Sequence, residues 1–177
     1  MNIWHDIDEK RIQENDFMAV IEIEQGSKKK YELDKETGML LLDRVLYTST
    51  HYPANYGFIP RTYAEDDDPL DVLVLCSEPI EPMVLVRCFP IGVITMVDNL
   101  RNDEKIIAIP FGDPMYSGYR DVSELPQHIF NEMKHFFSVY KALEGMETAV
   151  QKVEDRNAAM KIITQAINRY KKEVING

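Results

Sequence analysis

Residues 65–75 read Glu-Asp-Asp-Asp-Pro-Leu-Asp-Val-Leu-Val-Leu, so an acidic turn leads directly into an apolar run. The aspartates repel one another, and Pro69 stiffens the backbone between them. Asp71 stands at the junction with the apolar run, where an unpaired carboxylate would be costly to bury. Mg²⁺ or Ca²⁺ would offset that cost, because both ions bind carboxylate oxygens. The segment therefore favours a metal site, and a solvated acidic turn is the alternative.

Common metal and nucleotide signatures do not fit this chain. An EF-hand counted from Asp66 needs glycine at position 71 and glutamate at position 77, but the chain has Asp71 and Ser77 there. The four histidines show no HExxH spacing, which argues against zinc. Neither a GxxxxGKS/T loop nor a GxSxG motif occurs, which excludes P-loop NTPases and the usual serine hydrolases.

On both sides of this segment, the first two thirds of the chain has the pattern of β-strands. Residues 17–24 alternate imperfectly between apolar and polar side chains. Residues 30–34 and 39–44 flank a short loop that ends in Gly38, which predicts a hairpin. Further strands are expected at residues 72–76, 84–88, 91–97 and 105–109, with prolines at their ends.

The last third of the chain has a helical pattern. One helix is expected with Pro126 in its first turn and its end at Gly145, and its apolar face is formed by Ile129, Met133, Phe136, Phe137 and Tyr140. A second helix is expected from about Asn157. Strands followed by helices indicate the α+β class, here a closed or nearly closed antiparallel β-barrel with C-terminal helices. The length suits a single domain over residues 1–177.

Composition argues against several kinds of partner. The net charge of −10 is opposite to what binding of a nucleic-acid backbone needs. The apolar runs are far shorter than the roughly 20 residues of a membrane span. The acidic N-terminal stretch does not resemble a secretory signal, so a cytoplasmic protein is expected. Cys76 and Cys88 lie in apolar runs and are expected to be reduced core residues.

A second acidic group and a set of cations complete the candidate site. Residues 98–105 contain Asp98, Asp103 and Lys105, and taken alone they read as a polar hairpin loop. Carboxylates at the ends of several barrel strands could converge on one mouth with those of residues 66–71. Lysine and arginine bind phosphate oxygens, and a tyrosine hydroxyl can donate a further hydrogen bond. Each such residue is more often structural, so only a pattern that links them carries weight.

Taken together, these motifs resemble family I soluble inorganic pyrophosphatases from about Phe17 to at least Lys141. Residues 66–72 match the specific signature of that family. The other matching motifs, in chain order, are Ile21-Glu22-Ile23, Lys30-Tyr31-Glu32, Asp43-Arg44, residues 52–57, Asp98 with Asp103 and Lys105, and residues 135–141.

The resemblance implies an oligonucleotide-binding-like, five-stranded barrel and Mg²⁺-dependent hydrolysis of pyrophosphate to two phosphates. It also implies a homo-oligomer, with a hexamer favoured for a bacterial-type chain. Carried over residue by residue, it implies Asp66, Asp71, Asp98, Asp103 and Glu32 as metal ligands and Asp68 as the general base. It implies Lys30, Arg44, Tyr56, Lys105, Tyr140 and Lys141 as phosphate-binding residues, with Glu22 and Tyr52 in support.

One departure and three alternatives accompany this interpretation. Many family members carry glutamate directly after the aspartate at 98, where this chain has Asn99, which brings no charge to the metals on the substrate side. A barrel that binds single-stranded nucleic acid through aromatic side chains is one alternative, although the acidic balance opposes it. A metal-dependent phosphatase for nucleotides or polyphosphate is the second, and a calcium-binding structural module is the third.

Overall fold

The computed structural model describes residues 1–177, except for the side chain of Gln151. Its strands are β1 (Ile12–Gln13), β2 (Asp16–Ile23), β3 (Lys29–Leu33), β4 (Leu40–Val45), β5 (Asn55–Ile59), β6 (Leu70–Val74), β7 (Leu85–Asp98), β8 (Arg101–Pro110) and β9 (Thr148–Asp155). Its α-helices are α1 (Gln127–Val139) and α2 (Arg156–Tyr170), with 3₁₀ turns at Glu9–Arg11, Val122–Glu124 and Ala142–Glu144. A π-helical turn, Lys171–Ile175, follows α2.

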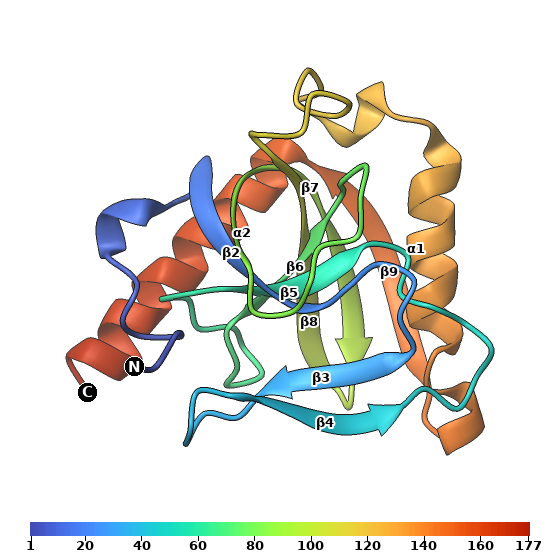
Figure 1. Ribbon diagram of the computed structural model, residues 1–177, viewed down its shortest axis with the longest axis horizontal. Coiled ribbons are helices and arrows are strands. Elements are labelled where there is room, and N and C mark those ends of the chain that lie inside the picture. The colour runs from blue at the N-terminus through green and yellow to red at the C-terminus, as the bar shows by residue number, and fades with distance from the viewer.

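Five of these strands form a ring. The order is β2-β5-β6-β8-β7, and β2 also pairs with β7 (Figure 1). The mixed α+β class is confirmed. The expectation of purely antiparallel strands is wrong at one place, because β6 and β8 pair in parallel. The chain leaves β6, returns along β7 and turns back sharply into β8, and this double reversal makes β8 run in the direction of β6.

The longest strand, β7, replaces two shorter strands predicted at residues 84–88 and 91–97. Its pairing with β8 shifts register between Pro90 and Gly92, where the proline has no N–H to donate to the ladder. After Asp98 a two-residue turn leads into β8. Asn99 and Leu100 there have φ of 50° and 65°, a conformation that asparagine adopts more readily than leucine. The acidic segment 98–105 is therefore mostly strand rather than loop.

The ring is filled and covered by apolar side chains on both faces of β2. The alternating residues of this strand, from Phe17 to Ile23, are buried, but so is Val20 on the opposite face. Trp4 and Tyr170 cover that second face. Where β2 crosses β5, a Cβ atom on Gly57 would lie 1.8 Å from the carbonyl oxygen of Val20. Only glycine therefore allows this close approach.

The two predicted helices are confirmed, and the chain between them contains a strand that the sequence pattern did not reveal. In Figure 1, α1 stands beside β9, and α2 crosses behind the strands of the ring. α1 starts right after Pro126 and buries Phe130, Met133, Phe136 and Phe137, whereas Ile129 is only half-buried. It ends at Val139, and Gly145, with φ of 74°, ends the following 3₁₀ turn instead.

The predicted hairpin is confirmed as a separate two-stranded sheet, β3–β4. Gly38 ends its loop with φ of 75°. Figure 1 shows the hairpin below the ring, with β3 nearer to it. Of the helices that the structure describes, none combines the length and the apolar run that a membrane crossing needs.

Candidate active site

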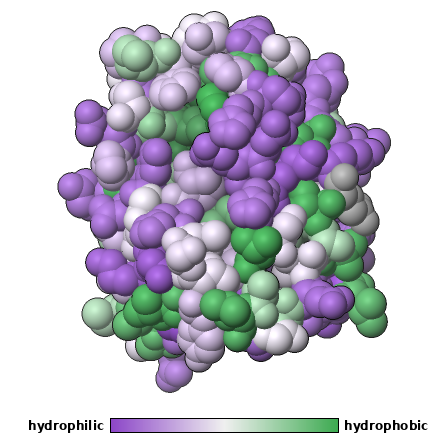
Figure 2. Space-filling model, turned by 90° about the vertical axis from the view of Figure 1, so that its right-hand side faces the viewer, coloured by the Kyte–Doolittle hydropathy of each residue, from purple (hydrophilic) through white to green (hydrophobic). Residues whose placement is uncertain are grey.

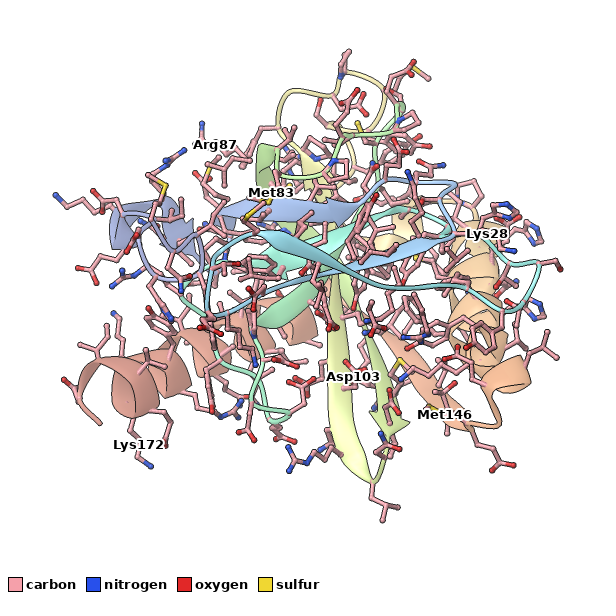
Figure 3. The ribbon with its side chains drawn as sticks, turned by 60° about the horizontal axis from the view of Figure 1, so that its bottom comes forward. Lys28, Met83, Arg87, Asp103, Met146 and Lys172 are labelled. Atoms are coloured by element: carbon pink, nitrogen blue, oxygen red, sulfur yellow. The ribbon has the colours of Figure 1, made fainter. Side chains whose placement is uncertain are left out.

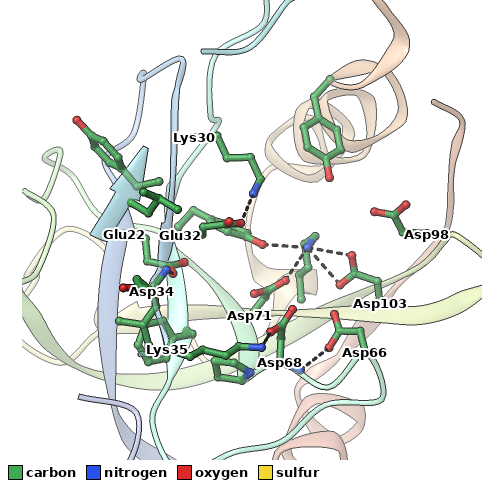
Figure 4. A pocket seen from close by; sticks show the side chains of 18 of the residues that line it. Glu22, Lys30, Glu32, Asp34, Lys35, Asp66, Asp68, Asp71, Asp98 and Asp103 are labelled. Atoms are coloured by element: carbon green, nitrogen blue, oxygen red, sulfur yellow. Dashed lines mark hydrogen bonds and ion pairs between the residues drawn. The ribbon is translucent and has the colours of Figure 1, made fainter. Parts of the chain in front are cut away.

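A cavity of about 510 Å³ lies between the ring and the hairpin. All but two of the site residues predicted from the sequence line it, and the exceptions are Arg44 and Tyr52. The residues brought together are Glu22, Lys30, Glu32, Tyr56, Asp66, Asp68, Asp71, Asp98, Asp103, Lys105, Tyr140 and Lys141 (Figure 4). They come from segments far apart in sequence, so the fold gathers them.

Strand register places the acidic residues and the central lysine. The parallel pairing sets Asp71 of β6 opposite Lys105 of β8. Asp103 lies two residues before Lys105, so both side chains emerge on the same face of β8. In Figure 3, Asp103 lies near the middle of the molecule, below the hairpin. The acidic loop before β6 adds Asp66 and Asp68 to the same cavity.

Lys105 is the most tightly held cation of the cavity, with its side chain only 3% exposed. Its ammonium donates to Asp71 Oδ2 at 2.8 Å, to the Tyr56 hydroxyl at 3.1 Å and to Asp103 Oδ1 at 3.2 Å. Burial acts to lower the pKa of Lys105, but Asp103 and Asp71 outweigh it, and the pKa is raised. Lys105 therefore stays charged in the interior of the protein.

The carboxylates around Lys105 remain short of positive charge. Burial, and then Asp71, Asp103 and Asp68, raise the pKa of Asp66 to about 7. Burial likewise raises the pKa of Asp103, although Lys105 opposes the shift. A carboxylate in such surroundings gains from a nearby cation. The electrostatics of this cavity thus fit the binding of additional positive charge.

Glu22 and Tyr52 are both buried, Glu22 in the wall of the cavity and Tyr52 behind it. Glu22 accepts the Leu33 N–H at 2.8 Å, and its pKa is raised to about 8 by burial and then by Asp71. Tyr52 lies behind the cavity wall, with its ring 5.3 Å from that of Tyr56 and 4.7 Å from that of Phe136. Tyr52 thus packs against both Tyr56 and α1.

The cationic side of the cavity is formed by the hairpin and by the end of α1. Lys30 lies 3.2 Å from Glu32 and 3.7 Å from Asp43. Lys141 donates to Asp98 Oδ2 at 2.6 Å, which ties the segment after α1 to the end of β7. Arg44 does not line the cavity, because its guanidinium contacts Asp43 and Glu144 instead.

Lys35 lines the cavity and was missed by the sequence analysis. Its ammonium forms an ion pair with Asp68 and contacts the Asp67 carbonyl oxygen, so it joins the hairpin loop to the acidic loop (Figure 4). A lysine in a hairpin loop carries no signal of its own. The contact arises only when the fold brings the two loops together.

The residues fit a hard divalent cation by chemistry rather than by a preformed cage. Among the described residues, no three histidine, cysteine, aspartate or glutamate side chains are close enough to hold one metal ion as they stand. Lys105 lies between Asp71 and Asp103. The donors around it are nevertheless carboxylate oxygens, the ligands that Mg²⁺ and Ca²⁺ prefer.

Comparison with known proteins decides the family. The profile described as "Inorganic pyrophosphatase" matches residues 19–171. The chain belongs to the inorganic pyrophosphatase family. Inorganic pyrophosphatases are hydrolases that split pyrophosphate into phosphate, so membership confirms the resemblance, the activity and the enzyme class expected from the sequence.

Relatives of this pyrophosphatase chain match it over nearly all of its length. Soluble inorganic pyrophosphatase 2 of Chlamydomonas reinhardtii is 46% identical over 172 residues, which cover 97% of this chain and 90% of the relative. The inorganic pyrophosphatase structure from Helicobacter pylori has a TM-score of 0.87 at 41% identity and covers 90% of this chain and 96% of its own. The structure from Thermus thermophilus has a TM-score of 0.86 at 40% identity, with 89% and 92% coverage.

Proposed function

We propose that this cavity hydrolyses pyrophosphate with Mg²⁺ as its metal and Asp68 as the general base. One observation carries the proposal. Within a single cavity, carboxylates that are short of positive charge lie opposite lysines and tyrosines that can bind phosphate. Family membership supplies the reaction, and the arrangement supports the roles of the individual residues.

The metal ligands would be Asp66, Asp71, Asp98, Asp103 and Glu32, all of which line the cavity. When bound, divalent cations lower the pKa of a water ligand towards about 7 and polarise phosphoryl oxygens. Magnesium is proposed because the donors are carboxylates and because Mg²⁺ binds through few carboxylates together with substrate phosphates.

Asp68 suits the role of general base because it is not one of the proposed metal ligands and lies at the solvent side of the cavity. Its side chain is about half exposed and is held by the ammonium of Lys35. A carboxylate oxygen of Asp68 would accept a proton from the attacking water, provided the two lie within hydrogen-bond distance. Lys35 then keeps the carboxylate turned toward the cavity.

The phosphate-binding residues supply the charge that pyrophosphate requires. Lys30, Lys105 and Lys141 line the cavity, together with the hydroxyls of Tyr56 and Tyr140. Fixed cations stabilise the negative charge on the leaving phosphate, and this electrostatic contribution dominates phosphoryl transfer. Arg44 would join them from β4 of the hairpin.

Several wider features are part of the same proposal. One domain over residues 1–177 would carry the activity, with the ring of strands as a closed, oligonucleotide-binding-like barrel, in the cytoplasm. A homo-oligomer, most simply a hexamer, is supported by exposed apolar side chains on the hairpin, which include Leu41, Leu42 and Val45. Figure 2 shows green side chains gathered in the lower part of one face, at the level of the hairpin.

Phosphate release from pyrophosphate tests the function directly. The purified protein should release phosphate with Mg²⁺, lose this activity on chelation and regain it when Mg²⁺ is restored. Activity on ATP or on a phosphomonoester should be much lower, and the reverse preference would favour a broader phosphatase. Folded protein that binds metal without any turnover would instead indicate a structural calcium-binding module.

A further inference from the structure

Arg44 and Lys30 occupy directly opposed positions on the hairpin. Like charges in directly opposed positions of an antiparallel pair destabilise it. Such a pair suits the binding of an anion that is shared by both cations. Yet Lys30 lines the cavity and Arg44 does not, so something holds Arg44 aside.

Two carboxylates engage Arg44 from different parts of the chain. Arg44 Nη1 donates to its neighbour Asp43. Arg44 Nε lies 2.7 Å from Glu144 Oε1, and the side chains of Arg44 and Glu144 are only 20% and 10% exposed. Glu144 belongs to the 3₁₀ turn that follows Lys141, so this ion pair joins the hairpin to the segment after α1.

The contact between Arg44 and Glu144 is incomplete. Both Arg44 Nε and Glu144 Oε2 are buried without a hydrogen-bond partner among the described residues. The 2.7 Å approach is therefore an ion pair with poor hydrogen-bond alignment. Buried charges that lack hydrogen bonds bear a desolvation cost that their attraction does not fully offset. The ion pair between Arg44 and Glu144 is therefore weaker than expected for side chains that are so little exposed.

A phosphate group would be a better partner for the guanidinium. It carries more negative charge than a carboxylate and offers more oxygens to the fork of N–H donors. Burial acts to lower the pKa of Arg44, but Asp43 and Glu144 outweigh it, so the pKa is raised and the donor stays charged. The contacts of Arg44 with Asp43 and Glu144 use Nη1 and Nε, which leaves Nη2 as the nitrogen that a phosphate would engage first.

We propose that Glu144 is a positioning residue that holds Arg44 away from the cavity until a phosphate group replaces its carboxylate. Glu144 thereby lowers the affinity for pyrophosphate and for the phosphate product. Asp43 keeps its contact with Nη1 throughout, so only the partner of Nε changes. When phosphate leaves, the carboxylate of Glu144 takes the guanidinium back, which favours product release. The inference rests on the proposed function, in which Arg44 binds phosphate.

Glu144→Gln and Glu147→Gln form a matched pair for the test. Both remove one negative charge from the same segment, but Glu147 is exposed. In Glu144→Gln, KM for pyrophosphate and the inhibition constant of phosphate should each fall about threefold or more, without a rise in kcat. Glu147→Gln should change neither constant. Equal behaviour of the two variants, or a raised KM in Glu144→Gln, would overturn the proposal.

A double-mutant cycle shows whether Glu144 acts through Arg44. In an Arg44→Gln background, the effect of Glu144→Gln on both constants should disappear. An effect of unchanged size would overturn the proposal. Glu144→Asp keeps the charge on a shorter side chain and should give intermediate constants, which separates this role from a loss of folding.

Calorimetric titration with inorganic phosphate separates this inference from the proposed function, because it needs no turnover. Tighter phosphate binding by Glu144→Gln than by the wild type supports the role of Glu144 even if pyrophosphate is not hydrolysed. Equal affinities, in a wild type that does hydrolyse pyrophosphate, overturn the inference and leave the function intact.

Discussion

The ring and the β3–β4 hairpin hold their charges in different ways. On the ring, strand register places Asp71, Asp103 and Lys105, and the buried ammonium of Lys105 lies between the two half-buried carboxylates. On the hairpin, Lys30 pairs with the more exposed carboxylate of Glu32, and Arg44 pairs with Glu144 from beyond α1 without complete hydrogen bonding. The ring thus provides fixed electrostatics, whereas the charges of the hairpin can change partners. Substitutions in matched positions can test that distinction.

The largest effect is expected from Lys105→Met on the ring. Loss of the ammonium leaves Asp71 and Asp103 facing each other, and breaking a buried ion pair typically costs about 3–5 kcal/mol. Lys30→Met on the hairpin should lower the free energy of unfolding by less than about 1 kcal/mol, because the carboxylates that pair with Lys30 are partly exposed. Urea unfolding of the chelated proteins measures both values. Similar losses of stability in the two variants would show that the charges of the ring are no more firmly held than those of the hairpin.

Next in size is the effect of Asp68→Asn on turnover. Loss of a general base should lower kcat by at least about 10²-fold while the fold stays intact. Asp67→Asn is the matched control in the same loop, since Asp67 has φ of 67°, which asparagine tolerates. Steady-state rates and circular dichroism of both variants check this. Near-normal kcat in Asp68→Asn would remove Asp68 from the role of base.

A smaller effect is expected on the metal requirement. Asp71→Ala removes a proposed ligand on the ring and should raise the Mg²⁺ concentration for half-maximal rate by about tenfold or more. Glu32→Gln on the hairpin should shift it by less, because a hairpin ligand is less firmly placed. Magnesium titrations at saturating pyrophosphate give both numbers. An unchanged titration in Asp71→Ala would contradict the assignment of Asp71 as a ligand.

The smallest effect concerns Glu22 and pH. Burial, followed by Asp71, raises its pKa from 4.5 to about 8, so the neutral form stabilises the fold below pH 4.5 and that stability is lost as pH rises through 8. Between pH 7 and 8, the free energy of unfolding of the chelated wild type should fall by about 1 kcal/mol more than that of Glu22→Gln. The amide oxygen in that variant can still accept the Leu33 N–H. Parallel stability curves for the two proteins would show that Glu22 does not titrate in this range.

Local patterns were sufficient to predict much of the fold and the cavity. The hairpin, both helices and the acidic loop before β6 follow from alternation, helical spacing and the run of aspartates in residues 66–71. The parallel pairing of β6 with β8 could not be predicted, because period 2 describes a strand and not its neighbour. Likewise β9 pairs with β7 only after α1 has turned the chain back.

The contacts of the site residues were harder to predict than their identity. The resemblance pointed to Arg44, but nothing local indicates that Glu144, a hundred positions later, would hold it beside the cavity. Lys35 was missed for the same reason, since its partner Asp68 belongs to another loop. Ion pairs between distant segments depend on the completed fold. The sequence therefore indicates which residue types form the site, but the ion-pair partners of Arg44 and Lys35 follow only from the fold.

Gly57 limits how sequences of this fold can diverge. At neighbouring Tyr56, a change to phenylalanine would remove only the hydroxyl and keep the ring. Position 57 offers no such intermediate, because even one methyl group would overlap the main chain of Val20. An ancestor that lost this glycine would have had to move a whole strand at once. Glycine is therefore expected at position 57 in any sequence that keeps this pairing of β2 with β5, even where the neighbouring site residues differ.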